Sequence, residues 1–270
     1  MKPVPVKNPF NAPVYYEEIL SSTMDSGREL AAKGTPHGTV ISAGFQEKGR
    51  GRRGRSWETE KNSSLMFTVF LDYKKIQDIP KALTLKTGLA VAQAVEDFIP
   101  ELKGLIAIKW PNDIMLVSRK LPAAKKTAGI LCECDNGNVF IGIGMNLVQK
   151  TFDNELSSKA CSLLSFLYDE YPDPEIQKPL LAPDAGCSLL EKILFCLHIE
   201  LRDHDNNWKD RLENKLYKRG DCVEFIEGGA DSRNVVRGIL SGIGDDGELI
   251  IKPENQNTSV KYITGELRVY

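Results

Sequence analysis

The sequence has little of what marks several protein classes. No apolar run approaches the roughly 20 residues needed to span a bilayer, and the opening residues MKPVPVKNPF contain no apolar signal segment. We therefore expect a cytoplasmic chain without a membrane anchor. The 35 lysines and arginines nearly balance the 37 aspartates and glutamates, giving a net charge of −2. This balance disfavours a general nucleic-acid binder, so any basic site must be local.

Motifs for metal binding and nucleophilic catalysis are also scarce. The three histidines are scattered without metal spacing. Cys132 and Cys134 share one face of an expected strand, where a core role is simpler than a metal site, and all six cysteines are expected to be reduced. Residues 142–144 (Gly-Ile-Gly) lack the third glycine of a dinucleotide turn, and no P-loop or Ser-His-Asp set is present. Any ATP is therefore bound outside a P-loop.

The pattern of apolar residues predicts an α+β protein with hairpin-linked strands and two parts, residues 1–219 and 220–270. Asp135-Asn136-Gly137-Asn138 is a strong hairpin turn signal. Expected strands cover 38–45, 64–71, 104–110, 112–118, 127–134 and 138–147, and expected helices cover 22–34, 81–98 and 187–218, the last with a break near His204. The first 15 residues are expected to form an extended lead-in, and residues 151–185 an irregular segment.

Residues 220–270 differ in pattern from the rest of the chain, because short apolar runs are separated there by turns rich in glycine and acidic residues. We expect a small antiparallel β module that packs on the larger part, because so few short strands are rarely stable alone. This module carries positive groups that could face phosphates or an acidic partner surface, namely Lys252, Lys261 and Arg268. The alternative is that these side chains are simply exposed to solvent.

The most informative segment is a loop of arginine and glycine, Gly49-Arg50-Gly51-Arg52-Arg53-Gly54-Arg55, followed by Ser56 and Trp57. Glycines allow the backbone to approach a ligand closely, and arginines donate in a fixed fork to phosphate or carboxylate. A nucleic-acid-binding loop or a solvated charge run is the alternative. Because the loop joins two apolar strands in a slightly acidic chain, small-molecule phosphate or carboxylate binding is favoured.

Three further blocks carry polar or glycine residues beside expected strands. In Lys109-Trp110-Pro111-Asn112-Asp113, the last two side chains suit Mg²⁺ held partly through phosphate oxygens, and a plain turn is the alternative. The others are Lys125-Lys126-Thr127-Ala128-Gly129-Ile130-Leu131 and Ile141-Gly142-Ile143-Gly144-Met145-Asn146. Glycines inside strands indicate close approach of a ligand or another backbone.

Together these blocks resemble the biotin–protein ligase family, as does the C-terminal pattern from Gly238 to Leu249. The resemblance spans roughly residues 15–270. It implies a class II synthetase-like core, with a mixed, mainly antiparallel sheet and flanking helices, and a C-terminal SH3-like β-barrel. It also implies a two-step reaction. Biotin and ATP, with Mg²⁺, give biotinyl-5′-AMP, and biotin then passes to a lysine of a carboxylase's biotin carboxyl carrier domain.

The resemblance also implies roles for residues that match the family's motifs. The implied biotin contacts are Ser22, Thr23, Met24, Gln46, Arg50, Gly51, Arg52, Trp57, Lys126 and Gly129. The implied ATP contacts are Arg52, Arg55, Trp57, Lys109, Asn112 and Asn146, with Asp113 as a magnesium ligand. Lys126, Arg52 and Arg50 are the implied catalytic residues.

The chain departs from the family pattern in two ways, and it is not expected to have a DNA-binding domain that some members carry. Met24 replaces the third residue of a Ser-Thr-Asn motif, which removes one polar contact. A longer stretch, SRKLPAAKK, follows Val117 and leaves Lys120, Lys125 and Lys126 as alternatives for the catalytic lysine, with the spacing to Gly129 favouring Lys126. Only about 21 residues precede Ser22, too few for a helix-turn-helix, so no DNA-binding domain is expected.

The sequence leaves alternatives for the function and for the oligomeric state. A lipoate–protein ligase shares the implied fold and adenylate chemistry, although the intact arginine loop argues against it. A biotin-binding protein without ligase activity and an RNA-binding module are the alternatives from other classes. The chain is expected to be a monomer or a homodimer.

Overall fold

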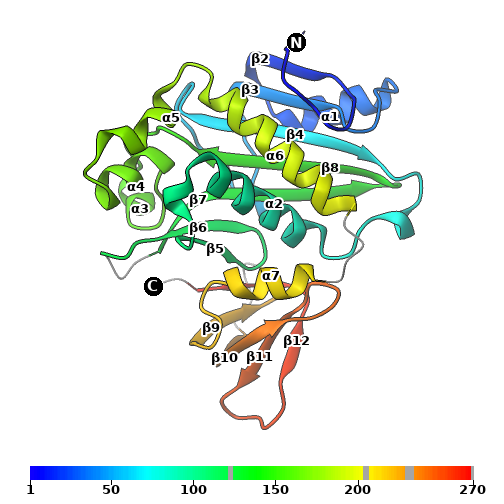
Figure 1. The fold of residues 1–270 in the computed structure, drawn as a ribbon. Helices are drawn as coiled ribbons and strands as arrows, with labels where there is room; N and C mark the ends of the chain where they lie inside the picture. The colour runs from blue at the N-terminus through cyan, green and yellow to red at the C-terminus, as the bar shows by residue number, and fades with distance from the viewer. Residues whose placement is uncertain (121–123, 203–206, 229–233, 269–270) are drawn as a thin grey trace.

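The computed structural model describes residues 1–120, 124–202, 207–228 and 234–268. The chain forms an eight-stranded sheet with helices packed against it and a separate five-stranded sheet near the C-terminus (Figure 1). This arrangement confirms the expected α+β class. No helix in the described ranges has the length and apolar character required to cross a membrane.

The large sheet is mainly antiparallel, as expected, and its strand order is β1-β2-β3-β4-β8-β7-β6-β5. Only β2 and β3 run parallel, joined by helix α1 (Thr23–Ala32). The strands are β1 (Lys2–Pro3), β2 (Val14–Leu20), β3 (Val40–Gln46), β4 (Ser64–Asp72), β5 (Ile106–Lys109), β6 (Asp113–Val117), β7 (Ala124–Asp135) and β8 (Asn138–Asn146).

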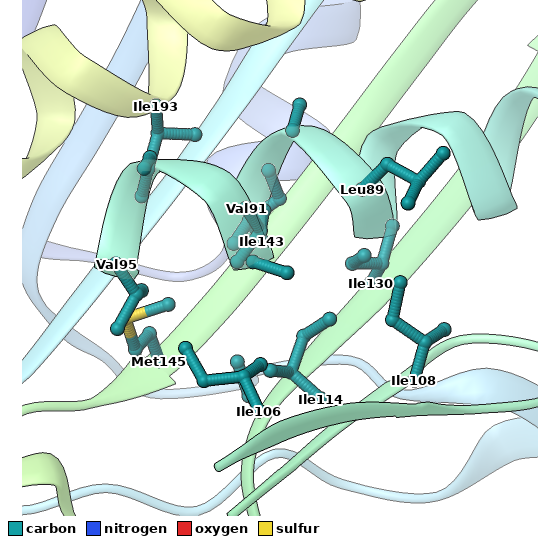
Figure 2. Packing of buried hydrophobic residues seen from close by; sticks show 14 of the residues in the cluster. Leu89, Val91, Val95, Ile106, Ile108, Ile114, Ile130, Ile143, Met145 and Ile193 are labelled. Carbon is teal, nitrogen blue, oxygen red and sulfur yellow. The ribbon is translucent and has the colours of Figure 1, made fainter. Parts of the chain in front are cut away.

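One face of this sheet carries the main hydrophobic core. Alternate residues of β4, such as Leu65, Phe67 and Val69, are buried there, as the two-residue period of a strand requires. Helices α2 (Leu83–Phe98) and α6 (Ala185–Arg202) cover this face. Figure 2 shows side chains of α2 beside those of β5, β6, β7 and β8 in this core.

The opposite face is only partly covered. The intervening β4 residues, including Phe70, point to this side, where Met24 of α1 packs on Phe70 and Phe140. A Cβ added to Gly27 of α1 would lie 3.4 Å from the Thr68 side chain and 3.5 Å from that of Phe140. The helix therefore packs directly on the sheet at Gly27.

The remaining helices of the large part are short. They are α3 (Asn154–Ser157), α4 (Leu163–Glu170), α5 (Lys178–Leu181) and α7 (Trp208–Lys215), with 3₁₀ turns η1 (Arg52–Gly54), η2 (Ile76–Asp78), η3 (Pro100–Leu102) and η4 (Pro174–Gln177). The interpretation of residues 151–185 as irregular is therefore wrong. A Ser162–Ser165 capping box starts α4 there, and Pro174 and Pro179 stand in first helical turns, where proline is tolerated.

Most other expected elements are confirmed to within a few residues. The β7–β8 hairpin turns at Asn136 and Gly137, which both have positive φ, as a two-residue hairpin turn requires. The strand β2 was missed, because residues 14–20 mix tyrosines and glutamates and do not alternate cleanly. The expected helical stretch 187–218 is two helices, and its predicted break near His204 lies outside the described residues. The core interpretation of Cys134 is wrong, since this thiol is exposed.

The small sheet has the order β12-β11-β10-β9-β13 and is antiparallel throughout. Its strands are β9 (Cys222–Glu227), β10 (Val235–Ile243), β11 (Leu249–Pro253), β12 (Val260–Tyr262) and β13 (Gly265–Leu267). The Trp110 indole donates to the Gly247 carbonyl at 2.9 Å, and its ring lies 5.9 Å from that of Phe225. The expected packing of this module on the larger part is confirmed.

Candidate active site

A cavity of about 130 Å³ opens on the sheet face that carries α1. Its walls come from the start of α1, the arginine-glycine loop between β3 and β4, the β5–β6 turn, β7, β8 and β13. All residues predicted for the site except Asn146 line it, namely Ser22, Thr23, Met24, Gln46, Arg50, Gly51, Arg52, Arg55, Trp57, Lys109, Asn112, Asp113, Lys126 and Gly129.

Asn146 is the predicted residue that the cavity leaves out. Its side chain is buried and donates to the Cys161 carbonyl at 3.4 Å. Its own carbonyl accepts from the Thr127 hydroxyl at 3.5 Å. Asn146 therefore links the end of β8 to neighbouring chain segments, and its contact with a nucleotide stays a prediction that this arrangement does not support.

One end of the cavity is polar and pre-ordered. The Gln46 side-chain oxygen accepts from the Thr23 backbone N–H at 2.8 Å and from the Thr23 hydroxyl at 3.0 Å, while Thr68 donates to that same hydroxyl at 2.9 Å. Ser22 is 1% exposed, and its hydroxyl has no hydrogen-bond partner in the described part of the chain. A buried hydroxyl without a partner is costly, so this end suits a ligand that supplies the missing hydrogen bond.

Met24 makes the adjoining wall apolar. Its side chain is buried against Phe70 and Phe140, with Leu131 packed on the same cluster. A Cβ on Gly142 would lie 2.8 Å from the Met24 sulfur, so the glycine leaves the room that the thioether occupies. Where the family pattern has an amide, this chain presents a flexible apolar side chain, which recognises shape rather than hydrogen bonds.

The arginine-glycine loop folds back on itself as a small hairpin. The Gly51 N–H donates to the Arg55 carbonyl at 2.7 Å and the Trp57 N–H donates to the Gly49 carbonyl at 2.9 Å. A Cβ on Gly49 would lie 2.4 Å from the Trp57 carbonyl oxygen, so only glycine fits there. The sequence thereby brings four arginine side chains to one rim of the cavity.

The arginines at the two ends of the loop face carboxylates. Arg50 Nη2 lies 2.9 Å from Asp25 Oδ1 and 3.5 Å from Glu133 Oε2. Arg55 forms a bidentate pair with Glu266 on β13, with 3.0 Å between Nη1 and Oε1. Arg53 also approaches Glu266, with 3.6 Å between Nη1 and Oε2.

Arg52 differs from its neighbours in the loop. It forms no ion pair within 4.0 Å among the residues the structure describes, and its Nη1 donates instead to the neutral Asn112 amide oxygen at 3.1 Å. Burial lowers the pKa of the Arg52 guanidinium, and the neighbouring Arg53 charge lowers it further. Arg52 therefore keeps a largely uncompensated positive charge at the cavity wall, ready for a ligand anion.

A β-bulge decides which lysine enters the cavity. Ile114 pairs with Ala128 but Met115 pairs with Lys126, so Thr127 is an extra residue on β7. An extra residue reverses the facing of the side chains that precede it. Lys126 therefore points to the cavity face with Gly129, while Lys125 points to the other face and donates to the Ser157 carbonyl at 2.9 Å.

The third alternative, Lys120, donates to the Asp169 carbonyl at 2.9 Å and does not line the cavity. Lys126 Nζ lies 2.6 Å from Asp113 Oδ1 and 5.2 Å from the centre of the Trp57 ring. Burial lowers the pKa of the neighbouring Lys109 ammonium. Of the three alternatives, the geometry favours Lys126.

Trp57 forms a wall over the strand glycines. A Cβ on Gly144 would lie 2.6 Å from the indole ring, and one on Gly129 would lie 3.0 Å from it. The close approach expected at these glycines is therefore made by Trp57 itself. The Trp57 indole N–H is buried with no hydrogen-bond partner in the described ranges, which leaves a donor for a bound molecule.

The oxygen atoms predicted to hold Mg²⁺ face cations instead. Both oxygens of Asp113 approach lysines, Lys126 at 2.6 Å and Lys109 at 3.8 Å, and the Asn112 oxygen accepts from Arg52. In the described ranges, no three His, Cys, Asp or Glu residues come together as a metal site. These donors do not fit a metal held by the protein alone. Asp113 as a magnesium ligand stays a prediction, and phosphate oxygens would have to supply most of the coordination.

The sequence patterns did not predict every residue that lines the cavity. Glu266 is the clearest example, because it comes from the small sheet and pairs with arginines of the loop. The positive groups expected to face the site from this module do not line the cavity. Lys261 pairs with Glu248 and Arg268 with Glu224, while Lys252 is exposed. No local pattern marks Glu266, because its role depends on a contact across some 200 residues of chain.

Comparison with known proteins finds a family to which part of the chain is similar. Residues 16–147 match the model of the biotin/lipoate A/B protein ligase family. Within these 132 of its 270 residues the chain is similar to that family. The resemblance inferred from the sequence blocks is thereby confirmed at the level of the biotin/lipoate ligases, and the matched range contains every predicted site residue.

Curated relatives within the family cover part of the chain. It is 37% identical over 156 residues to the bifunctional ligase/repressor BirA of Bacillus subtilis, which is 55% of this chain and 45% of that protein. It is 30% identical over 155 residues to the biotin–[acetyl-CoA-carboxylase] ligase of Mycobacterium tuberculosis, 54% of each chain. The chain thus spans about half the length of the curated relatives it matches.

Solved structures show the same fold over nearly the whole chain. The biotin protein ligase of Aquifex aeolicus in complex with biotin and ATP superposes with a TM-score of 0.71 at 24% identity, covering 95% of this chain and 98% of the other. The Leishmania major enzyme in complex with biotinyl-5-AMP gives 0.61 at 23% identity, covering 93% and 98%. The small C-terminal sheet is therefore part of a shared architecture.

Proposed function

We propose that this chain is a biotin–protein ligase, which uses ATP to form biotinyl-5′-AMP and then transfers biotin to a lysine of a biotin carboxyl carrier domain. The observation that carries the proposal is the set of groups that line one cavity. The polar end at Ser22 and Gln46 suits the ureido ring of biotin, Trp57 and Lys126 lie beside each other in the same cavity, and Arg52 contributes positive charge from the loop.

The first step asks for positioning and charge stabilisation rather than a covalent nucleophile. A biotin carboxylate oxygen attacks the α-phosphorus of ATP, an O–P bond forms, and the bond to the bridging oxygen of pyrophosphate breaks. In this proposal Lys126 holds the attacking carboxylate against the phosphate, and Arg52 donates to the charge that develops on the phosphoryl oxygens. Mg²⁺ would arrive with the nucleotide and neutralise part of its charge.

In the second step the acceptor lysine's amine attacks the carbonyl carbon of the mixed anhydride. A C–N bond forms, AMP leaves, and the amine loses its proton. The M. tuberculosis relative is named for acetyl-CoA carboxylase, so we propose the carrier domain of that enzyme as the acceptor.

Three broader features belong to the same proposal. Residues 1–219 form the catalytic domain and residues 220–270 a C-terminal β domain, supported by the two separate sheets. The six cysteines are unpaired, which supports a reducing compartment such as the cytoplasm. The active unit is a monomer or a homodimer.

The test is incubation of the protein with ATP, Mg²⁺, biotin and a purified carrier domain, read by intact mass spectrometry. The expected result is the added biotinyl mass on one carrier lysine. Because the family also includes lipoate ligases, a parallel reaction contains lipoate in place of biotin. Modification with lipoate alone would replace this proposal, and no modification with either acid would contradict ligase activity on this acceptor.

A further inference from the structure

The first arginine of the loop is held by two acids from different elements. Arg50 Nη2 lies 2.9 Å from Asp25 Oδ1, in the first turn of α1, and 3.5 Å from Glu133 Oε2, on β7. The three side chains are 37%, 47% and 30% exposed. The contact therefore joins the loop to both α1 and the sheet at the cavity rim, within reach of water.

Glu133 is itself fixed independently of the loop. Arg28 Nη2 lies 2.7 Å from Glu133 Oε2, the same oxygen that Arg50 approaches. The Arg28 guanidinium lies over the Phe140 ring, 4.6 Å from its centre. Because α1 and β8 already order this carboxylate, little conformational entropy remains to be lost when Arg50 binds it.

We propose that Glu133 and Asp25 form an acidic clamp that positions Arg50 and so holds the first half of the arginine-glycine loop over the cavity. The clamp acts through Arg50 and touches no substrate. Its consequence for catalysis rests on the proposed function, since it matters only if the loop closes over biotin and ATP. The clamp itself belongs to the ligand-free chain and can be tested without any ligand.

The exposure of the three side chains sets the strength of the clamp. Ion pairs in contact with water contribute modestly and are screened by salt. A weak clamp suits a loop that must open to admit substrates and close again during the reaction. We expect its loss to raise the open population of the loop by up to about fivefold, the upper limit that exposed ion pairs support.

The test is amide hydrogen exchange of residues 49–57 in the ligand-free full chain. The Gly51 and Trp57 N–H groups are hydrogen-bonded within the loop hairpin, so their exchange reports its opening. Glu133→Gln is expected to speed this exchange by up to about fivefold at low salt. The matched control is Glu29→Gln, since Glu29 is an exposed acid on the same helix as Asp25, and it should leave the exchange unchanged.

A double-mutant cycle separates the clamp from a general loss of structure. In an Arg50→Gln background, Glu133→Gln should add no further exchange, because the pair is already broken. Unchanged exchange in Glu133→Gln, or the same increase with and without Arg50, would overturn the proposal. If Glu133→Gln fails to fold, Asp25→Asn is measured in the same cycle and must meet the same criteria.

Activity provides a separate measurement. The clamp predicts that Glu133→Gln raises the KM for biotin by a similar factor while kcat for carrier modification changes less. Faster exchange in a protein that ligates no biotin would leave the clamp standing and refute the proposed function. Normal ligation of biotin with unchanged hydrogen exchange in Glu133→Gln would support the proposed function and refute the clamp.

Discussion

The two ends of the arginine-glycine loop are anchored to different parts of the molecule. Arg50 at the first end meets carboxylates of α1 and β7, all within the range that matches the ligase family. Arg55 at the second end meets Glu266 of the small sheet, 211 residues further along the chain. The first anchor ties the loop to the floor that carries the polar end of the cavity. The second ties it to a module outside the family match.

Arg52, which lies between these ends, differs from both of them. Arg52 bonds to a neutral amide rather than to a carboxylate, and burial lowers the pKa of its guanidinium. The loop therefore separates two tasks that its sequence does not distinguish, since anchoring arginines and a ligand-facing arginine look alike. The comparison predicts that substitutions should be most harmful at the residues proposed to meet the ligand and mildest at the anchored ends of the loop.

The largest effect is expected at Lys126, which belongs to neither end. Lys126→Met should slow adenylate formation by about 2.7–4 kcal/mol of transition-state energy, on the order of 100- to 1000-fold. Pyrophosphate exchange with biotin and ATP measures this step. The control is Lys125→Met, because the bulge at Thr127 turns that neighbour to the opposite face. Equal losses in both variants would refute the assignment.

The second-largest effect is expected at Arg52, because it carries the ligand-facing charge of the loop. Arg52→Gln keeps a donor for Asn112 but removes the positive charge, and charged hydrogen bonds contribute about 1.5–3 kcal/mol. We expect kcat/KM for ATP in pyrophosphate exchange to fall roughly 10- to 150-fold. Arg55→Gln, at the anchored second end, serves as the comparison and should lose far less. The division of tasks within the loop fails if Arg55→Gln is the more damaging substitution.

The sequence blocks located most of this site but not its internal contacts. Lys125 and Lys126 are adjacent lysines, and only the backbone bulge, which depends on pairing with β6, shows which one faces the cavity. Asn146 matched the family motif, yet its amide is used within the protein. Motifs report which residue types are available, whereas strand register and tertiary contacts decide where each side chain points.

Prediction of the fold from the sequence was limited in the same way. A continuous apolar run predicted β4 and a turn signal predicted the β7–β8 hairpin, because local sequence decides those elements. Strand β2 pairs in parallel with β3 across a helix, and a pairing of that kind leaves no local turn signal. The contact of Glu266 with the loop is likewise a property of the folded chain alone.

A smaller effect is expected at the second anchor. Glu266→Gln removes the charge that pairs with Arg55, whose side chain is 59% exposed. Exposed pairs contribute at most about 1 kcal/mol, so the KM for ATP should rise no more than about fivefold and the KM for biotin should stay unchanged. Lys252→Gln is the control, since Lys252 is exposed on the same small sheet. A rise in the KM for biotin instead would show that the two anchors do not divide the cavity as proposed.

The smallest effect is the pH dependence of this second anchor. The hydrogen bond from Arg55 holds the pKa of the Glu266 carboxyl below its ordinary value of 4.5, against a smaller opposing effect of burial. A carboxyl with a lowered pKa in the folded state stabilises the protein above its ordinary pKa, and this contribution disappears as the pH falls through the folded-state value.

The melting temperatures of the wild type and of Glu266→Gln should therefore differ most near neutral pH and converge below about pH 4.5. Both proteins lose stability in acid as other carboxylates protonate, so only the difference between them reports on Glu266. High salt at neutral pH should narrow the same difference, because the pair is partly exposed and screened. A difference that stays constant from neutral to acid pH would mean that Glu266 holds the loop by shape rather than by charge. The second anchor would then be a packing contact, unlike the ionic clamp at the first.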